Sequence, residues 1–340
     1  MTSMRLGGMS GLPDAVVHVP GSKSVANRAL VCAALAPEGA VSHVRNVPGG
    51  DDCAAMLRAL VACGSAHGDE IRGGLFPRGA DRFDAGIAGT TSRFLTAVAA
   101  LSPSGIVIDG GDPLRRRPMA DLHEALRHLG ARVDAVDGAA PGHLPVRVSG
   151  GNLAGGSVAI RGDVSSQFIS ALMLVGPVMR DGLRISVSGT LVSRPYVEMT
   201  AEVMRVFGAQ VEIDSDHITV HPGAYHRTDY EVEPDFSSAA FAVMSLAFSP
   251  GRVRVPRLHT AMLQGDSLVL DIARTMGMTV AFDGDDVLVE VSPGTILSPV
   301  SVNLSDASDL VPAVVVACTA IPGVSTISGV GFIRAKESDR

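Results

Sequence analysis

The sequence predicts a mixed α/β protein built from a repeated unit of strand, helix, strand, helix and two further strands. Two observations carry the prediction. Helix patterns that end in a glycine and lead into a strand recur along the chain, and the intervals between these glycines are 66, 78 and 69 residues. A more apolar helix pattern precedes each of them. Similar elements at a similar spacing are typical of an internal repeat. The glycines are Gly64, Gly130, Gly208 and Gly277.

The first helix of each repeat is apolar nearly all round, as residues 168–179 and 239–248 illustrate. Helices of that kind are buried in a larger structure. They open at small or hydroxyl-bearing residues, which cap helices well. A fifth pattern runs over residues 303–321, with Pro312 near its start, and a strand pattern at 324–328 follows it.

The second helix of each repeat is amphipathic, and its glycine is the expected left-handed stop. Alternating apolar residues, as at 146–148, 183–187 and 287–291, predict strands with one buried face. Two second helices carry a proline in the first turn, where proline is tolerated. We expect the second helices to open at Asp51-Asp52, Arg117-Pro118, Arg194-Pro195 and Gly265-Asp266.

The composition bounds the class of protein. At 340 residues the chain is long enough for two domains. Its net charge of −7 and its 4% aromatic content argue against nucleic-acid binding, which needs a basic face and stacking rings. No apolar run reaches membrane-spanning length and the N-terminus lacks a signal-peptide core, so we expect a cytoplasmic protein. The four cysteines show no metal-binding spacing and are expected to be small buried hydrophobes.

Residues 20–28 place a lysine, an arginine and hydroxyls at the start of an apolar helix. A helix start already favours anions, and Lys23 and Arg28 add two full charges. Lysine and arginine total 28, yet only Lys23 and Lys336 are lysines. A lysine kept in such a chain is predicted to serve as a compact ammonium whose pKa can shift. The alternative for this segment is an ordinary helix cap with exposed basic residues.

Six motifs occur in order along the chain: Pro20-Gly21-Ser22-Lys23-Ser24 with Asn27-Arg28-Ala29, Ala88-Gly89-Thr90-Thr91-Ser92-Arg93, Gly110-Gly111-Asp112-Pro113-Leu114 with Arg117-Pro118-Met119, Ser165-Ser166-Gln167-Phe168, Val192-Ser193-Arg194-Pro195-Tyr196 and Arg334-Ala335-Lys336-Glu337-Ser338-Asp339-Arg340. Together these motifs resemble the EPSP synthase family. The fold of that family is a two-domain inverse barrel with three βαβαββ units in each domain, which agrees with the repeat described above. The resemblance implies a first domain at residues 21–228 and a second domain at 1–20 and 229–340.

The reaction that the resemblance implies transfers the enolpyruvyl group of phosphoenolpyruvate to the 5-hydroxyl of shikimate 3-phosphate and releases phosphate. It serves aromatic amino-acid biosynthesis, and it requires no metal and no organic cofactor. Two anionic substrates call for fixed cations and helix starts, and the chemistry needs an acid for the enol methylene and a base for the attacking hydroxyl. The partners implied are these small molecules, with no nucleic acid and no membrane, and a complete chain is expected to act as a monomer.

The resemblance also assigns roles to individual residues. Asp309 would face the reacting hydroxyl, Lys336 would touch it, and Glu337 would carry the methylene proton. With Lys23, these three form the implied catalytic set. The residues implied for shikimate 3-phosphate are Lys23, Ser24, Arg28, Ser165, Ser166, Gln167, Ser193, Tyr196, Asp309 and Lys336. Those implied for phosphoenolpyruvate are Lys23, Gly89, Arg117, Gln167 and Arg340.

Plainer interpretations stay open at three places. Ser165 and Ser166 fit simple helix capping as well as phosphate binding. The arginine run at 115–117 fits a solvated charged surface, an interpretation that we keep for the first two arginines but not for Arg117. Asp309 fits an acid that is favoured at a helix start, and Asp306 is a rival for its role.

The sequence departs from the family's pattern in three places. Ile87 stands where the family usually has asparagine, and Phe332 stands where a polar residue is common. The family's Asp-His-Arg segment and its last active-site lysine fall beyond residue 340. We therefore expect a second domain that lacks its C-terminal part.

Three other functions stay open. UDP-N-acetylglucosamine enolpyruvyl transferase shares the fold and the phosphoenolpyruvate chemistry, but it has Lys-Asn where Lys23-Ser24 stands and usually a cysteine at the position of Asp112. An enolpyruvyl transferase that acts on a related cyclohexene acid would show similar motifs. A truncated, non-catalytic relative would bind a phosphorylated ligand through the same serines and arginine and turn nothing over.

Overall fold

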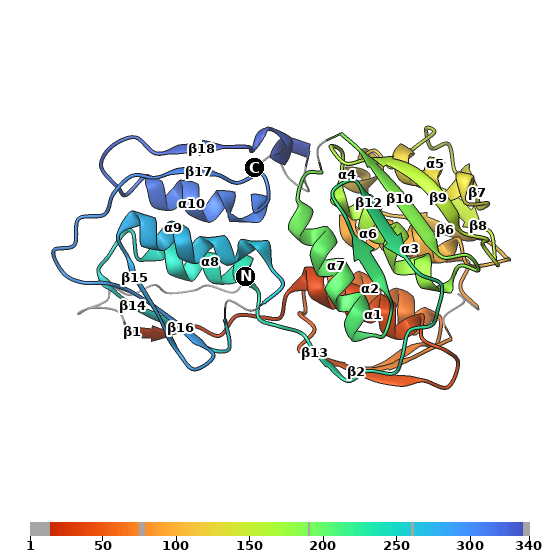
Figure 1. Cartoon of the computed structure of the whole chain (residues 1–340), viewed down its shortest axis with the longest axis horizontal. Coiled ribbons are helices and arrows are strands. Elements are labelled where there is room, and N and C mark those ends of the chain that lie inside the picture. Colours follow the sequence, from red (N-terminus) through yellow and green to blue (C-terminus); the bar gives the residue numbers. More distant parts are fainter. Residues whose placement is uncertain (1–13, 75–78, 190, 260–261, 336–340) are drawn as a thin grey trace, which may run out of the picture. The chain divides into compact units, whose positions relative to one another are not determined.

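The computed structural model describes residues 14–74, 79–189, 191–259 and 262–335 of the chain. Up to Gly331 they fall into two units, a larger unit at Gly21–Glu233 and a smaller unit that combines Pro234–Gly331 with the segment before Gly21 (Figure 1). The chain passes from one unit to the other at residues 20–21 and at 233–234. The larger unit runs past residue 228, the limit expected from the sequence, because a short strand lies at Tyr230–Glu231.

The described residues of the larger unit form three four-stranded sheets of one pattern. In each sheet the first two strands run parallel, and the remaining neighbours run antiparallel. This is the arrangement of a βαβαββ unit. In sheet order the strands are β13 (Tyr230–Glu231), β2 (Val41–Arg45), β4 (Glu70–Arg72) and β3 (Ala66–His67); β5 (Arg82–Asp84), β6 (Ile106–Asp109), β8 (Val146–Ser149) and β7 (Arg132–Ala135); and β9 (Gly156–Arg161), β10 (Leu183–Ser188), β12 (His217–Val220) and β11 (Val211–Ile213).

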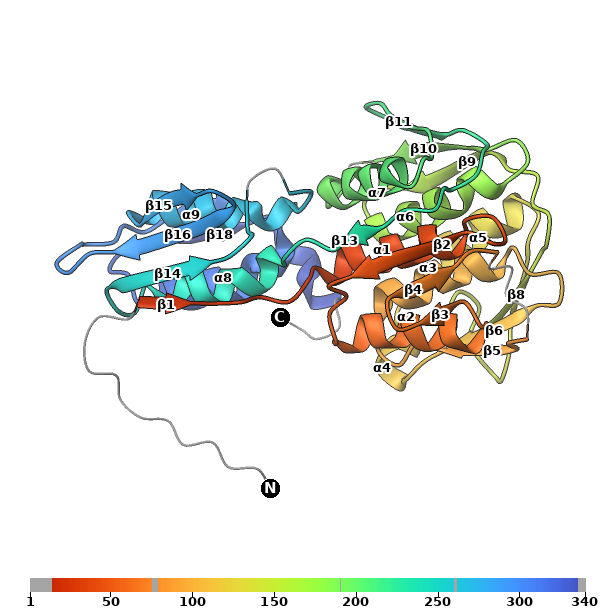
Figure 2. The same ribbon diagram turned by 90° about the horizontal axis from the view of Figure 1, so that it is seen from below.

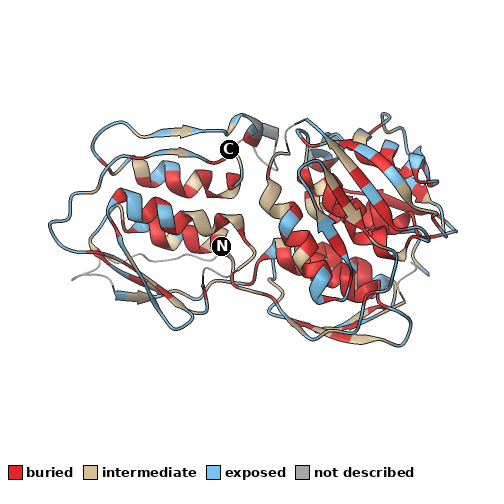
Figure 3. Ribbon diagram, viewed as in Figure 1, coloured by how far each residue is buried: buried red, intermediate tan, exposed pale blue. Residues whose placement is uncertain are grey.

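In the larger unit the first helix of each repeat is buried nearly all round, as the sequence predicts (Figure 3). The same prediction is wrong for residues 239–248 of the smaller unit, where Phe241 and Phe248 are each 58% exposed. Strands such as β9 and β12, by contrast, alternate between buried and more exposed residues. The sheet that contains β9 and β12 therefore packs one face on the helices and turns the other toward solvent, whereas β6 of the second repeat's sheet is buried on both faces. The first helices are α1 (Lys23–Ala34), α3 (Gly89–Ala99) and α6 (Ser166–Val175), the second helices are α2 (Asp51–Ala62), α5 (Ala120–His128) and α7 (Arg194–Val206), and α4 (Asp112–Arg115) and η1 (Gly176–Val178) are short.

The glycine at the end of each second helix adopts the left-handed conformation that the repeat predicts. At Gly208 a Cβ would also collide with the ring of His226, so glycine is required there for two reasons. The φ angles are 70° at Gly64, 100° at Gly130, 90° at Gly208 and 98° at Gly277.

The smaller unit contains a fourth repeat and the parallel strands of a fifth. Its four-stranded sheet has the same pattern as the sheets of the larger unit, and a separate parallel pair follows it. The elements are β1 (Asp14–Val16), α8 (Phe236–Ser245), β14 (Gly251–Val255), η2 (Gly265–Ser267), α9 (Leu268–Met276), β15 (Thr279–Asp283), β16 (Asp286–Val291), β17 (Ser301–Asn303), η3 (Ser308–Leu310), α10 (Val311–Cys318) and β18 (Thr326–Ser328). A last short helix, η4 (Gly331–Ala335), begins at the residue where this unit ends.

Two of these sheets take their first strand from a distant part of the chain (Figure 2). β13 pairs with β2, with Tyr230 opposite Val44, and so completes the sheet of the first repeat. β1 pairs with β14, with Asp14 opposite Arg252, and so completes the sheet of the fourth repeat. Each of these two sheets is therefore continuous in space, although its strands come from separate parts of the chain.

The sequence overestimates the length of two elements in the fifth repeat. The helix expected at 303–321 begins as an α-helix only at Val311, because Asn303 belongs to β17 and its Oδ1 accepts a hydrogen bond from the Ser305 N–H (2.9 Å). That side-chain contact favours a turn over a helix. The strand expected at 324–328 is limited to Thr326–Ser328.

Two composition-based expectations can be compared with the structure. Among the described residues, no helix has the length and apolar character needed to cross a membrane. Cys32 and Cys53 are buried, and burial raises the pKa of both thiols to about 12. Cys63 and Cys318 are only half-buried, so the expectation that all four cysteines are core residues is wrong for these two.

Candidate active site

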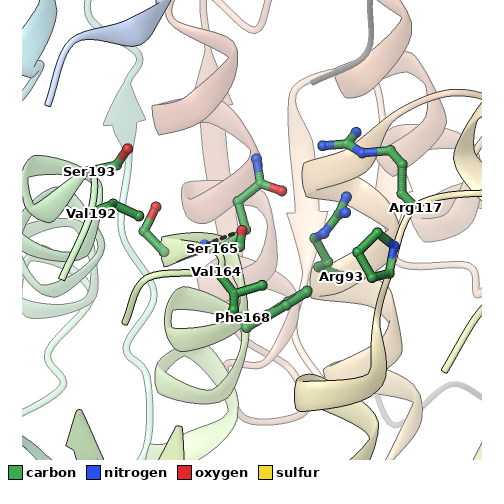
Figure 4. Close-up of a pocket in the computed structure, with 10 residues that line it drawn as sticks. Arg93, Arg117, Val164, Ser165, Phe168, Val192 and Ser193 are labelled. Atoms are coloured by element: carbon green, nitrogen blue, oxygen red, sulfur yellow. Dashed lines mark hydrogen bonds between the residues drawn. The ribbon is translucent and has the colours of Figure 1, made fainter. Parts of the chain in front are cut away.

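A pocket of about 130 Å³ lies in the larger unit where α3, α6 and α7 begin (Figure 4). Helix starts carry unpaired N–H groups and a partial positive charge, so a pocket at three of them favours anions. Arginines lie on one side of it and serines on the other. The lining residues are Arg93, Arg117, Pro118, Val164, Ser165, Ser166, Gln167, Phe168, Val192 and Ser193.

The serine side is formed by the starts of α6 and α7. Ser165 is the N-cap of α6, and its hydroxyl accepts a hydrogen bond from the Gln167 N–H (3.3 Å). Ser166 and Ser193 are each 6% exposed. Ser193 has a φ of 55°, a left-handed conformation that residues other than glycine adopt at an energetic cost. The fold thus holds a strained serine at the pocket, which is a common feature of binding sites.

The arginine side is formed by α3 and the loop that precedes α5. A Cβ added to Gly89, the first residue of α3, would collide with Nη1 of both Arg93 and Arg117. The two guanidinium groups therefore meet over Gly89, and glycine is what leaves them room. Arg93 also lies over the ring of Phe168, 5.6 Å from its centre. Two like charges held this close favour an anion between them.

The arginines at 115–117 have different roles. Arg115 donates two hydrogen bonds to Asp109, both at 2.9 Å, and Arg82 donates a third at 2.5 Å. Burial alone would raise the pKa of Asp109, but the hydrogen bonds from Arg115 and Arg82 outweigh it and lower that pKa to about 2. Arg116 is exposed, and Arg117 is the member of the run that lines the pocket.

The start of α1 lies beside this pocket's helices but does not line it. Lys23 is the first residue of α1, its side chain is 46% exposed, and its Nζ lies 3.6 Å from Asp52 Oδ2. Ser24 is half-buried. Neither is among the residues that line the pocket. α1 packs against both α7 and α3, which brings its first turn into the same group of helices.

Arg28 is buried, so the alternative interpretation of this segment as a helix cap with exposed basic residues is wrong for Arg28. It is 1% exposed and donates hydrogen bonds to four acceptors: Thr200 Oγ1 (2.7 Å), the Ser24 carbonyl (2.6 Å), Ser170 Oγ (3.2 Å) and the Tyr196 carbonyl (3.1 Å). Burial lowers the pKa of Arg28 to about 10, so the guanidinium stays charged at neutral pH. Its implied contact with a substrate carboxylate stays a prediction.

Gln167 joins the two sides of the pocket. Its Nε2 donates a hydrogen bond to Thr90 Oγ1 (3.1 Å), which links the starts of α6 and α3. Its Oε1 is buried and has no hydrogen-bond partner among the described residues. An orphaned buried acceptor of this kind is suited to a ligand that carries a donor.

Comparison with known proteins decides the family. The family model for EPSP synthase (3-phosphoshikimate 1-carboxyvinyltransferase) matches residues 12–340. The chain belongs to the EPSP synthase family. The 3-phosphoshikimate 1-carboxyvinyltransferase of Methanothermobacter thermautotrophicus is 41% identical over 97% of this chain and 78% of that protein. The enzyme of the same name from Bacteroides fragilis is 33% identical over 96% of this chain and 75% of that protein.

Solved structures share the fold. The EPSP synthase from Acinetobacter baumannii superimposes with a TM-score of 0.76 and 24% identity over 96% of this chain and 77% of that chain. The enolpyruvyl transferase NikO from Streptomyces tendae has a TM-score of 0.69 and 16% identity over 93% of this chain and 75% of that chain.

The structure gathers some of the residues that the EPSP synthase resemblance singles out and leaves others elsewhere. Gly89, Arg117, Ser165, Ser166, Gln167 and Ser193 lie at or beside the pocket, Tyr196 is half-buried in the first turn of α7, and Arg93 is an addition that the sequence analysis missed. Asp309 is half-buried in η3 of the smaller unit, and its rival Asp306 is exposed. Ile87, at the family's asparagine position, is 47% exposed. Lys336, Glu337 and Arg340 lie outside the described residues.

Proposed function

We propose that this chain transfers the enolpyruvyl group of phosphoenolpyruvate to the 5-hydroxyl of shikimate 3-phosphate and releases phosphate. The observation that carries the proposal is the pocket at the starts of α3, α6 and α7, where two guanidinium groups face serine hydroxyls. Cations, hydroxyl donors and helix starts all favour anionic substrates. Membership of the EPSP synthase family supports the same reaction.

The serine side suits the phosphate of shikimate 3-phosphate. Ser165, Ser166 and Ser193 offer hydroxyl donors beside the free N–H groups of two helix starts. Tyr196, one turn into α7, would lie beside the ring. We assign Ser24 and Arg28 to the carboxylate, with the Arg28 guanidinium held at the first turns of α1 and α7 by its bonds to the Ser24 and Tyr196 carbonyls.

The arginine side suits phosphoenolpyruvate. The Arg117 guanidinium presents a planar fork that matches a carboxylate or a phosphate with two hydrogen bonds. Gly89 leaves space for the two guanidinium groups and for an anion between them. Gln167 adds a polar contact at the boundary between the two substrates, and Lys23 and Arg340 would complete the charge balance.

The chemistry needs groups that move protons. The oxygen of the 5-hydroxyl bonds to the enol carbon while the methylene takes a proton, and loss of that proton together with phosphate leaves the enol ether. We assign Asp309 to the hydroxyl, Lys336 to the hydroxyl and the phosphate, and Glu337 to the methylene proton. Lys23 would stabilise charge on the reacting phosphate, since a compact ammonium suits a point contact.

Phosphate release tests the proposal. Purified protein is given shikimate 3-phosphate and phosphoenolpyruvate together and singly, with UDP-N-acetylglucosamine as the competing acceptor. We expect release only when both proposed substrates are present, and we expect Lys23→Met to abolish it. Release with UDP-N-acetylglucosamine would point to the other enolpyruvyl transferase. Binding of shikimate 3-phosphate without turnover would indicate a non-catalytic relative.

We also infer that the protein acts as a cytoplasmic monomer on small molecules, without nucleic acid or membrane. The acidic net charge of −7 supports the absence of nucleic-acid binding. Light scattering after gel filtration would give the mass of one chain if the inference is right, and twice that mass would contradict it.

A further inference from the structure

The buried contacts of Arg28 connect four helices of the larger unit. We call Arg28, Phe94, Ser170 and Thr200 the Arg28 cluster. The guanidinium donates to the two hydroxyls and lies over the Phe94 ring, 5.3 Å from its centre. Every member is at most 1% exposed. The members come from α1, α3, α6 and α7, so the cluster ties together the helices whose starts surround the pocket.

Each polar member of the cluster lies about one helical turn after another residue implied for shikimate 3-phosphate, and Arg28 belongs to both sets. Arg28 follows Ser24 by four residues, Ser170 follows Ser166 by four, and Thr200 follows Tyr196 by four. Four residues correspond to about 6 Å along a helix axis, slightly more than one turn, so the side chains share a face. The cluster is therefore the layer on which the ligand-facing residues rest.

The direction of the hydrogen bond between the Ser170 and Thr200 hydroxyls follows from the fact that each hydroxyl has one proton to donate. The Thr200 hydroxyl donates its single proton to the Tyr196 carbonyl (2.7 Å), so its oxygen accepts from Arg28 Nε and from Ser170. The Ser170 hydroxyl therefore donates to Thr200 (2.8 Å) and accepts from Arg28 Nη2. Each hydroxyl fills a role that an aliphatic side chain of the same shape would leave empty.

The charge of Arg28 is not cancelled within the cluster. Its hydrogen-bond acceptors are hydroxyls and backbone carbonyls, and none of the ion pairs among the described residues involves it. A buried cation without a carboxylate partner keeps its field in a low-dielectric interior. That field adds to the positive ends of α1, α6 and α7. The position of the guanidinium therefore matters to any anion bound above it.

We propose that Ser170 and Thr200 are positioning residues for the shikimate 3-phosphate site. They hold the Arg28 guanidinium in place and, through its bonds to the Ser24 and Tyr196 carbonyls, fix the first turns of α1 and α7 at the spacing that the ligand needs. Neither residue contacts substrate. The inference rests on the proposed function and names the part of the site that determines the affinity for shikimate 3-phosphate.

Thr200→Val tests the inference, because valine keeps the branched shape and removes the hydroxyl. Its matched control is Thr275→Val in α9, an exposed threonine that makes the same bond to the carbonyl four residues earlier (2.8 Å). We expect Thr200→Val to raise the Kd and KM for shikimate 3-phosphate about tenfold, equivalent to about 1.4 kcal/mol, and the KM for phosphoenolpyruvate by less than about twofold. Ser170→Ala should shift the same constants in the same direction, and Thr200→Ser should restore them.

Calorimetric titration with shikimate 3-phosphate and steady-state phosphate release provide the constants, with circular dichroism to show that each variant is folded at the assay temperature. If Thr200→Val and Ser170→Ala are folded and their affinity for shikimate 3-phosphate is unchanged, the inference is overturned. An equal rise in both KM values, or no recovery in Thr200→Ser, would also overturn it, because either result indicates a general distortion. If the unaltered protein neither binds shikimate 3-phosphate nor releases phosphate, the proposed function fails and this inference fails with it.

Discussion

Two arginine clusters in the larger unit use the same side chain in opposite ways. In the Arg28 cluster the cation is buried, and its acceptors are uncharged hydroxyls and carbonyls. At the end of β6, Asp109 accepts hydrogen bonds from Arg82 and Arg115, whose side chains are 46% and 42% exposed. The positive charge is cancelled there by a carboxylate. The first cluster leaves its charge available to an anion, whereas the second anchors a loop.

The comparison separates a structural arginine from one that serves a ligand. Arg115 and Arg117 are two residues apart, yet only Arg117 lines the pocket. The ion pair of Arg115 with Asp109 fixes α4 and thereby the loop that carries Arg117. Arg115 therefore holds the loop, and Arg117 is the arginine of the two that lines the pocket.

The largest effect is expected from removing the buried cation. Arg28→Met leaves two hydroxyls and two carbonyls without their donor, and we expect the free energy of unfolding to fall by about 3 kcal/mol. The affinity for shikimate 3-phosphate should fall more than about 100-fold. Arg82→Met, which breaks a half-exposed ion pair, should lower the free energy of unfolding by less than about 1 kcal/mol. Urea unfolding and calorimetry measure both variants, and equal losses would erase the distinction between the clusters.

Next in size is the contrast within the arginine run. Arg117→Met removes a forked cation from the pocket, so we expect kcat/KM for phosphoenolpyruvate to fall about 100-fold. The neighbouring Arg116→Met, which removes an exposed arginine of the same run, should stay within about twofold of the unaltered protein. Steady-state phosphate release at several phosphoenolpyruvate concentrations gives these constants. A comparable loss in both variants would mean that the run acts only through its total charge.

A smaller effect is expected at the glycine beneath the two guanidinium groups. Gly89→Ala would force Arg93 and Arg117 apart, because the new Cβ collides with both. We expect the KM for phosphoenolpyruvate to rise about tenfold, while that for shikimate 3-phosphate changes by less than about twofold. Gly223→Ala is the control, since a Cβ at Gly223 has no heavy atom within 4 Å. A rise in the KM for shikimate 3-phosphate alone would contradict the assignment of this side of the pocket.

The smallest effect concerns pH. Hydrogen bonds from Arg115 and Arg82 lower the pKa of Asp109 to about 2 despite the opposing effect of burial. Its folded pKa is below its unfolded value of about 3.9, so its contribution is complete above about pH 4 and is lost as the pH falls toward 2. We expect a loss of about 1–2 kcal/mol, reduced from the full shift because both arginines are half-exposed. Urea unfolding at pH 5.5 and pH 3 should therefore separate Asp109→Asn from the unaltered protein less at the lower pH. If the two proteins differ in their free energy of unfolding by the same amount at both pH values, protonation of Asp109 does not cause the loss of stability.

The sequence predicts the repeat and the serine side of the pocket well, because both depend on local patterns. The glycine stops and the capping residue Ser165 are read directly from a few adjacent residues, and the structure has them where they are expected. β1 and β13 were missed because strands of three and two residues carry no detectable alternation. Their identity depends on partners far away in the chain.

The charged residues show the same limit more clearly. Arg28 looks like part of an exposed helix mouth, but its partners Ser170 and Thr200 lie 142 and 172 residues further along the chain. Arg93 was missed because it stands in an apolar helix pattern that suggests only core packing. Its spacing of four residues from Gly89 was the signal available, since that places both on one face of α3. Long-range polar partners leave little trace in a single sequence.

The exchanged strands have a consequence for how the protein is made. The sheet of the first repeat cannot close until Tyr230 and Glu231 have left the ribosome, although its other strands end at Arg72. The opening segment at Asp14–Val16 waits longer, because its partner Gly251–Val255 is synthesised later still. During that interval the edges of β2 and β1 lack their final neighbours, and pairing across such long separations is slow. We therefore expect those edges to stay open to other strands while translation proceeds.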